Sequence, residues 1–190
     1  SKCDLASLFG VETFCISNNN NPTNWCLSKT KEVGVDGFLV TASTTSSDPI
    51  HIAANSSRKR GRIILVGVTG LDLNRNLFYK KELTFQVSCS YGPGRYDKNY
   101  EEKSIDYPIG FVRWTEKRNF LSILDLLANK QLNVNDLISH RFDIKNAKKA
   151  YELISDNKPS LGIIINYPYK KVLTNKSIIV YIHSRLLNYQ

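Results

Sequence analysis

The chain opens on a pattern of apolar positions with the spacing of a helix. Leu5, Leu8 and Phe9 would share one helical face, and Gly10 follows where a glycine commonly ends a helix. The next six residues, ETFCIS at 12–17, mix apolar and polar positions and predict a short strand. The N-terminal part therefore predicts a helix followed by a strand.

Two longer segments are apolar almost throughout, which is typical of strands buried on both faces of a parallel sheet. They are VDGFLVTAS, residues 35–43, and GRIILVGVTG, residues 61–70. A helix is predicted before the first of them, with Asn21 as cap and a proline in its first turn. Another helix is predicted between them, from Asp48 to about Arg60. This alternation of helices and strands indicates a parallel sheet with crossover helices.

The second half of the chain continues with one strand, two amphipathic helices and two final strands. The strand is LTFQVSCS, residues 83–90. The apolar stripes of the two helices are Phe120, Ile123, Leu124 and Leu127, then Ala147, Ala150, Tyr151 and Ile154. Asp143 is the expected cap of the second helix. The final strands, at residues 161–167 and 177–182, follow each other without a helix between them and predict a second structural layer.

Composition limits the classes of protein that this chain can belong to. Its 190 residues suit one domain, or one domain with an appendage, and no stretch approaches the roughly 20 apolar residues of a membrane span. A net charge of +9 keeps nucleic-acid binding as a hypothesis. The positive residues are scattered, however, and their densest groups, residues 58–60 and 80–81, lie beside predicted element ends. Nucleic acid is therefore disfavoured as a partner.

Cysteine, histidine and methionine usage adds three expectations. Four cysteines form no CxxC pair, which indicates reduced thiols in a cytoplasmic protein; they are Cys3, Cys15, Cys26 and Cys89. Three histidines lack the spacing of metal ligands, so no metal site is expected; they are His51, His140 and His183. The sequence contains no methionine. We therefore expect the chain to be a piece of a longer polypeptide.

The predicted sheet identifies one candidate ligand-binding edge. In an open parallel sheet, ligands lie beyond the carboxyl ends of the strands. This rule selects the residues after two of the predicted strands, namely Thr41, Ala42 and Ser43, and Val66, Gly67, Val68 and Thr69. Gly67 would allow a ligand to approach the backbone closely. The alternative is that the threonine and serine side chains only cap the helix that follows.

A second candidate is the loop that begins SYGPGRYDKNYEEKSIDYP at residue 90. Its GPGR run matches neither the P-loop nor the dinucleotide-binding glycine pattern, so it does not predict a phosphate-binding loop. Arg95 can pair with a phosphate or carboxylate through its guanidinium fork, and nearby aromatic rings can stack on a sugar; they are Tyr91, Tyr96, Tyr100 and Tyr107. The alternative, which the residues leave open, is an ordered loop whose tyrosines pack on the next helix.

Several segments together resemble the C-terminal part of a medium-chain dehydrogenase/reductase of the zinc-type alcohol dehydrogenase superfamily. The resemblance covers roughly residues 1–167 and rests on CDLASLFGVETFCIS, VDGFLVTAS, GRIILVGV, ISHRFDIKNAKKAYELI and LGIIINY. The run SYGPGRYDKNYEEKSIDYPIGFVRWTEKRN is similar to the reductase half of bacterial bi-domain oxidoreductases, which are typically encoded with surface-polysaccharide pathways. The family's GxGxxG turn and its catalytic domain, with the zinc ligands, are not found in this sequence.

This resemblance implies an α/β fold with a truncated Rossmann-like parallel sheet, flanking helices and a small C-terminal β addition. Residues 1–130, with the loop at 90–118, would form a partial nucleotide-binding domain. Residues 131–190 would supply a helix and strands that return toward the catalytic domain. Family members pair through the strand after the GVT turn, so residues 83–90 are expected to form a homodimer edge.

The resemblance also implies a function. NAD or NADP would bind a partial site made by residues 41–43 and 66–69, with no zinc in this chain. A sugar or nucleotide sugar would meet Arg95, Tyr96, Tyr100 and Tyr107. We expect the isolated chain to be inactive, although the parent protein would be an NAD(P)-dependent oxidoreductase. The alternatives are a non-catalytic dimerisation module or, less favoured, a basic domain that binds nucleic acid.

Overall fold

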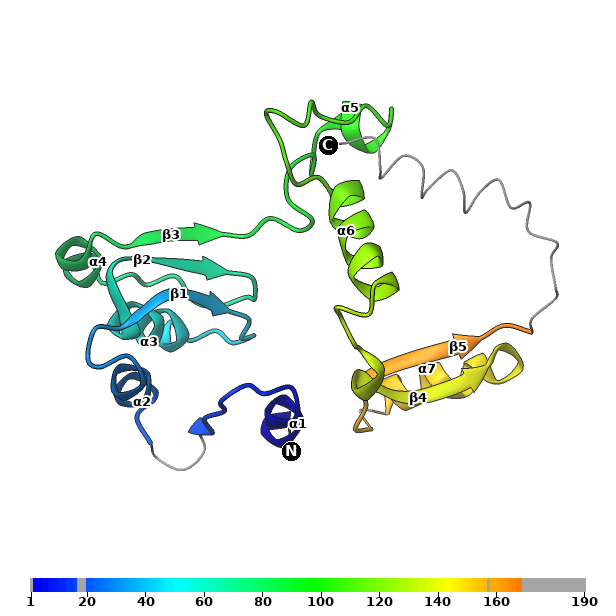
Figure 1. Ribbon diagram of the computed structural model, residues 1–190, viewed down its shortest axis with the longest axis horizontal. Coiled ribbons are helices and arrows are strands. Elements are labelled where there is room, and N and C mark those ends of the chain that lie inside the picture. The colour runs from blue at the N-terminus through cyan, green and yellow to red at the C-terminus, as the bar shows by residue number, and fades with distance from the viewer. Residues whose placement is uncertain (1, 17–19, 157, 169–190) are drawn as a thin grey trace. The chain divides into compact units, whose positions relative to one another are not determined.

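The computed structural model describes residues 2–16, 20–156 and 158–168, which fall into two compact units (Figure 1). The first unit is Ser1–Gln131 and the second is Leu132–Gln190. The predicted strand at residues 177–182 lies outside the described residues. The α/β fold with parallel strands and flanking helices is confirmed.

A three-stranded parallel sheet forms the centre of the first unit. Its strands are β1 (Val35–Val40), β2 (Ser57–Leu65) and β3 (Thr84–Val87), in that spatial order. Ile63 of β2 pairs with Phe38 on one side and with Phe85 on the other. The connecting helices are α3 (Asp48–Ser56) and α4 (Arg75–Lys81). The alternation predicted from the apolar segments is therefore present in this sheet.

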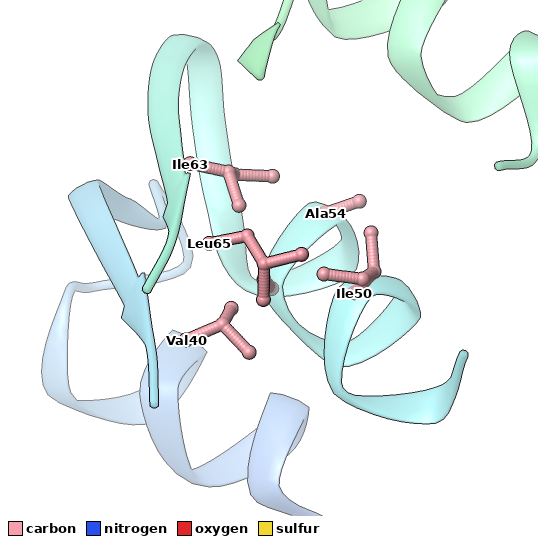
Figure 2. Close-up of a cluster of buried hydrophobic side chains, with 6 residues drawn as sticks. Val40, Ile50, Ala54, Ile63 and Leu65 are labelled. Atoms are coloured by element: carbon pink, nitrogen blue, oxygen red, sulfur yellow. The ribbon is translucent and has the colours of Figure 1, made fainter. Parts of the chain in front are cut away.

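The core of this unit lies between the sheet and α3 (Figure 2). Ile50 and Ile63 are fully buried, and the other members of the cluster are Val40, Ala53, Ala54 and Leu65. Full burial of an isoleucine side chain contributes roughly 1.5–3 kcal/mol. The two alanines lack long side chains, so the backbone of α3 can lie close to the sheet. This packing attaches α3 to both β1 and β2.

The boundary between α3 and β2 differs from the prediction. We expected a helix to about Arg60, but α3 ends at Ser56 and β2 begins at the next residue. The β1–β2 register shifts after Val35, so the polar residues 58–60 bulge out of the ladder. Arg60 adopts a positive φ of 59°, and the side chain of Arg58 donates to Asp36 at 2.5 Å. Nothing in the local sequence distinguishes this bulge from a last helical turn.

The N-terminal helices follow the prediction, but the strand between them does not. The first helix, α1 (Lys2–Leu8), ends before Gly10, whose φ is +76°. The cap of α2 (Pro22–Lys29) is Asn21, whose side chain accepts from the amides of two residues in the first turn. Residues 11–15 form no strand, because no described strand pairs with them. Phe14 packs instead on Trp25, with 5.3 Å between the ring centroids.

Helix α4, which the sequence analysis missed, supplies a cap to α3. The Nζ atom of Lys81 donates to three carbonyl oxygens at the end of α3, those of Ala54, Asn55 and Ser57, at 3.0, 2.7 and 2.7 Å. An ammonium group has three donors, so this geometry uses all of them. Burial lowers the pKa of Lys81. The Lys81 ammonium group therefore satisfies carbonyl groups at the C-terminus of α3. The sequence does not reveal this contact, because Lys81 is far from these residues along the chain.

The remainder of the first unit contains α5 (Lys98–Glu101) and α6 (Glu116–Ala128). The helix predicted around Phe120 is confirmed as α6, which begins at Glu116. The apolar stripe of α6 stays largely solvent-exposed in the described structure; its members are Phe120, Ile123, Leu124 and Leu127. None of the helices in the described ranges is long and apolar enough to cross a membrane.

The described part of the second unit is built from two parallel strands and one α-helix. The strands are β4 (Ile138–Asp143) and β5 (Gly162–Asn166), with α7 (Ala147–Ser155) between them in sequence and short 3₁₀ turns at Asn135–Leu137 and Ile144–Asn146. The strand predicted at residues 161–167 is confirmed as β5, whereas β4 was not predicted. The predicted cap was wrong: Asp143 precedes the second 3₁₀ turn, and Asn146 precedes α7. Ala150 is the buried member of the helix's apolar stripe.

Candidate functional site

The carboxyl ends of β1 and β2 are joined by backbone hydrogen bonds beyond the regular strands. Ser43 and Val68 form an isolated parallel bridge. The amide of Thr44 donates to the carbonyl of Val68 at 2.9 Å, and the amide of Val68 donates to the carbonyl of Ala42 at 3.0 Å. We call residues 41–44 and 66–70 the strand-end edge. Both segments selected from the sequence therefore lie together in this edge.

Gly67 lies in close contact with the other segment of the strand-end edge. A Cβ atom on this residue would collide with the carbonyl oxygen of Ala42 and come within 2.7 Å of the carbonyl carbon of Thr41. The space beside Gly67 is thus filled by the protein's own backbone. From the sequence, Gly67 was expected to let a ligand approach the backbone closely; in the structure it lets the backbone of residues 41–42 approach instead.

The hydroxyl groups of Thr41 and Ser43 are exposed and bond to no other group in the described part of the chain. The turn before α3 is stabilised by other side chains. Thr44 accepts from the amide of Ser46 at 3.2 Å, and Ser46 accepts from the amide of Asp48 at 3.0 Å. The helix-capping alternative is therefore wrong for Thr41 and Ser43. Their hydroxyls remain available to a ligand.

The rest of the strand-end edge offers apolar surface. Val66 and Val68 are 54% and 73% exposed, while Ala42, Gly67 and Thr69 are half-buried. Exposed aliphatic side chains beside free hydroxyls suit a flat ring that carries polar substituents, because binding sites combine apolar walls with a few polar groups. The residues present are therefore compatible with part of a nicotinamide coenzyme.

Arg95 belongs to a second cluster, in the segment that we call the tyrosine loop (residues 90–118). Its Nη1 atom donates to Glu101 at 2.6 Å, and the hydroxyl of Tyr91 donates to the same carboxylate oxygen. The guanidinium carbon lies 4.4 Å from the ring centroid of Tyr96 and 5.8 Å from that of Tyr91. Hydrogen bonds from Tyr91 and then Arg95 lower the pKa of Glu101. The bond to Glu101 in turn raises the pKa of Arg95.

Tyr100 and Tyr107 are held inside the tyrosine loop. Their rings stack with 5.8 Å between centroids. Gly94, at a φ of +99°, lies against Tyr100 so closely that a Cβ would come within 2.5 Å of the ring. The hydroxyl of Tyr107 donates to Asp97 and lowers the pKa of that carboxyl group. These two predicted ligand residues therefore have structural contacts of their own.

The loop is also fastened to the start of α6. Arg118 donates to the carbonyl of Tyr107 at 2.5 Å and to the carboxylate of Asp106 at 3.1 Å. The structure thus separates the predicted set: Arg95 and the 77% exposed Tyr96 reach solvent, whereas Tyr100 and Tyr107 are half-buried. Sequence reasoning missed Glu101, Asp97 and Arg118 as loop partners, because no residue spacing marks contacts made across an irregular loop.

The histidines make ordinary contacts where they are described. His51 Nε2 lies 2.8 Å from the carbonyl oxygen of Asp72, and the ring of His140 stacks on Phe142. His183 lies outside the described residues. Across residues 2–16, 20–156 and 158–168, no group of three or more potential ligand side chains is placed to hold a metal ion.

Replacing Gly67 with alanine should destabilise the first unit by about 1–3 kcal/mol or more, because the added methyl group overlaps the backbone of residues 41–42. Urea unfolding of the variant measures this loss. Gly110→Ala is the matched control, since a Cβ there meets nothing within 4 Å. Equal stability of the two variants would contradict the close approach at Gly67.

Acid should loosen the tyrosine loop. The folded pKa values of Glu101 and Asp97 lie below their ordinary values of 4.5 and 3.8. Their bonds therefore contribute stability that is present above those ordinary values and is lost as the pH falls through the lowered ones. We expect the near-ultraviolet circular dichroism of the tyrosines to decrease in that range. The combined Glu101→Gln and Asp97→Asn variant should abolish this step; an unchanged step would contradict the assignment.

Comparison with known proteins identifies the fold. No family model matches the chain, and no curated protein sequence matches it. Solved structures do, among them an alcohol dehydrogenase from Thermus sp. ATN1, with 20% identity and a TM-score of 0.64 over 88% of this chain and 41% of that one. Galactitol-1-phosphate dehydrogenase from Escherichia coli matches with 21% identity and a TM-score of 0.60, over 85% of this chain and 42% of that one.

A third solved structure gives the same result. It is 2R,3R-butanediol dehydrogenase from Bacillus subtilis, with 16% identity and a TM-score of 0.61, over 87% of this chain and 40% of that one. The chain spans about two fifths of the length of these structures. The TM-scores establish a shared fold, whereas identities this low leave the activity to be argued from the site. The chain therefore shares the fold of the part of these dehydrogenase structures that it matches.

Proposed function

We propose that this chain forms the nicotinamide-side wall of an NAD(P)-dependent oxidoreductase that acts on a sugar or nucleotide sugar. The observation that carries the proposal is the strand-end edge, where residues 41–44 and 66–70 meet at the carboxyl ends of two parallel strands. Ligands of open α/β sheets bind at this kind of edge. The shared fold with alcohol dehydrogenases supports the same class of chemistry.

Within this proposal, each residue of the edge has a defined task. The exposed valines 66 and 68 provide an apolar wall for the ring, and the hydroxyls of Thr41 and Ser43 bind its polar substituents. When bound, the nicotinamide would accept or donate a hydride at a carbinol carbon of the substrate. The sequence contains no GxGxxG turn for the pyrophosphate. Coenzyme contacts in this chain are therefore partial, and we expect no turnover by the chain alone.

The tyrosine loop is the proposed substrate side. Arg95 and Tyr96 present a cation and an aromatic face to solvent, a combination that suits a sugar bearing an anionic group. Galactitol-1-phosphate dehydrogenase, whose fold this chain shares, is named for such a substrate. Surface-polysaccharide synthesis in the cytoplasm is the setting that we propose, as the resemblance of the loop to bi-domain oxidoreductases implies.

Val68→Glu should weaken binding of NADH to the chain roughly tenfold, because a carboxylate at the edge repels the coenzyme's phosphates and removes apolar wall. Saturation-transfer NMR and isothermal titration measure this change. Val33→Glu is the matched control: Val33 is 64% exposed but lies at the amino end of β1. If both variants bind NADH as tightly as the wild type does, the coenzyme does not bind at the strand-end edge.

A second candidate function is self-association through β3. In the described part of the chain this strand pairs only with β2, so its other backbone edge is unpaired. Val87 at its end is 53% exposed. Unpaired strand edges readily bind a further strand. We propose that two copies of the chain pair along this edge and form a homodimer.

Light scattering during size-exclusion chromatography tests this second candidate. The wild type should show a dimer mass that rises with concentration, and Val87→Lys should shift it toward monomer, because lysine on an edge strand disfavours pairing. Val33→Lys should leave the mass unchanged. A wild type that stays monomeric at the highest concentration it tolerates would exclude pairing through β3.

A further inference from the structure

We propose that the amino-terminal edge of the three-stranded sheet is a binding surface for single-stranded nucleic acid. The edge combines a row of exposed cations, which contact the phosphates, with one exposed tyrosine, which stacks on a base. This role goes beyond the proposed oxidoreductase function. It also lies at the opposite end of the sheet from the strand-end edge, because the strands are parallel.

The topology of the sheet brings together positive residues that are scattered along the sequence. The strands β1, β2 and β3 are parallel neighbours in that order, so all three begin at the same edge (Figure 1). Residues 58–60 bulge at the start of β2, and Lys81, which precedes β3, donates to the carbonyl of Ser57. The turn before β1 lies at the same place, because a Cβ on Gly34 would come within 2.6 Å of the amide nitrogen of Arg58. The two densest positive groups of the sequence are therefore neighbours in the fold.

This edge carries most of the charge excess of the described chain. We call residues 31–36, 58–62 and 80–82 the basic edge. It contains seven positive and three negative residues, so its net charge is +4. All other described residues together have fifteen positive and fourteen negative side chains, a net charge of +1. Nucleic acid was disfavoured from the sequence because the positive residues are scattered, and the fold removes that objection.

Most cations of the basic edge are available to a ligand. Arg58 pairs with Asp36, and Lys81 donates to three carbonyl oxygens. The other five cations are exposed and form no ion pair with another described residue; they are Lys31, Lys59, Arg60, Arg62 and Lys80. They belong to the segments at which the three strands begin, so they form a row across the sheet edge. Such a row suits a linear chain of phosphates, because each cation that neutralises a phosphate releases a condensed counterion.

Tyr79 supplies an aromatic surface beside this row. It directly precedes Lys80 near the end of α4 and is 71% exposed. The guanidinium carbon of Arg75 lies 5.0 Å from the centroid of its ring, which adds a further cation at the same place. Proteins that bind single strands combine cations along the backbone with aromatic rings on which bases stack. Bases inside a duplex are not accessible to such a ring, so Tyr79 favours a single strand.

Fluorescence anisotropy with a labelled oligothymidylate of about 12 nucleotides tests this surface. The full 190-residue chain should bind it. The logarithm of the association constant should fall against the logarithm of salt concentration with a slope of about −3, because each of roughly four or five contacts contributes about 0.7. Lys59→Gln combined with Lys80→Gln should weaken binding at least roughly tenfold and make the slope shallower by about 1.4.

Lys145→Gln combined with Lys149→Gln is the matched control for charge. It removes the same two positive charges from exposed sites in the second unit, so it should leave binding nearly unchanged. Circular dichroism verifies that each variant remains folded.

Tyr79→Ala should weaken binding at least roughly fivefold and leave the salt slope unchanged, because it removes stacking but no charge. Tyr151→Ala is its control, since Tyr151 is 65% exposed on α7 in the second unit, and it should bind as the wild type does. A duplex of the same length should bind more weakly than the single strand.

Four results would overturn the inference. They are no binding by the wild type, equal losses in the two double lysine variants, unchanged binding by Tyr79→Ala, or tighter binding to phosphatidylserine vesicles than to the oligonucleotide. The last result would make the basic edge a membrane-binding surface. The test is separable from the coenzyme proposal, because saturating NADH should not displace an oligonucleotide from the opposite edge. Displacement by NADH would instead place the oligonucleotide at the strand-end edge and contradict the basic edge.

Discussion

The close approach of two backbones at Gly67 is the constraint on which the candidate coenzyme site depends. Because the space next to this residue is filled by residues 41–42, the ends of β1 and β2 stay in register for several residues beyond the strands. The packing of α3 on the sheet also holds β1 and β2 together, because residues of both strands contact this helix. Two short loops thereby become one edge, and the exposed side chains on it acquire fixed relative positions.

The tyrosine loop is held together by hydrogen bonds between side chains, whereas backbone contacts join the strand-end edge. It contains little regular structure, yet acidic side chains accept hydrogen bonds from tyrosines and arginines along its length; the pairs include Glu101 with Tyr91 and Arg95, and Asp97 with Tyr107. These pairs are solvent-accessible, so each contributes little to the free energy of unfolding by itself. Their combined effect is to connect residues that are distant within the loop, and the pair with Glu101 holds the side chain of Arg95.

Much of this fold could be predicted from the sequence, and the failures have a common physical origin. Continuous apolar segments predicted β1 and β2, and Asn21 before a proline predicted the start of α2. The missed features depend on contacts distant in sequence: the bulge at residues 58–60 forms against β1, and residues 11–15 have no partner strand among the described residues. The position of the strand-end edge followed from a general rule. The sequence did not predict that residues 41–42 lie against Gly67 or that Glu101 pairs with Arg95, because tertiary structure determines both contacts.

The most direct test of the central claim is residue-by-residue mapping of coenzyme binding. Amide resonances of the ¹⁵N-labelled chain would be followed by NMR while NADH is added. We expect the shifts to concentrate at residues 41–44 and 66–70, where the two strand ends meet. Shifts that are absent there and appear instead at the amino end of β1, around Val33, would contradict it.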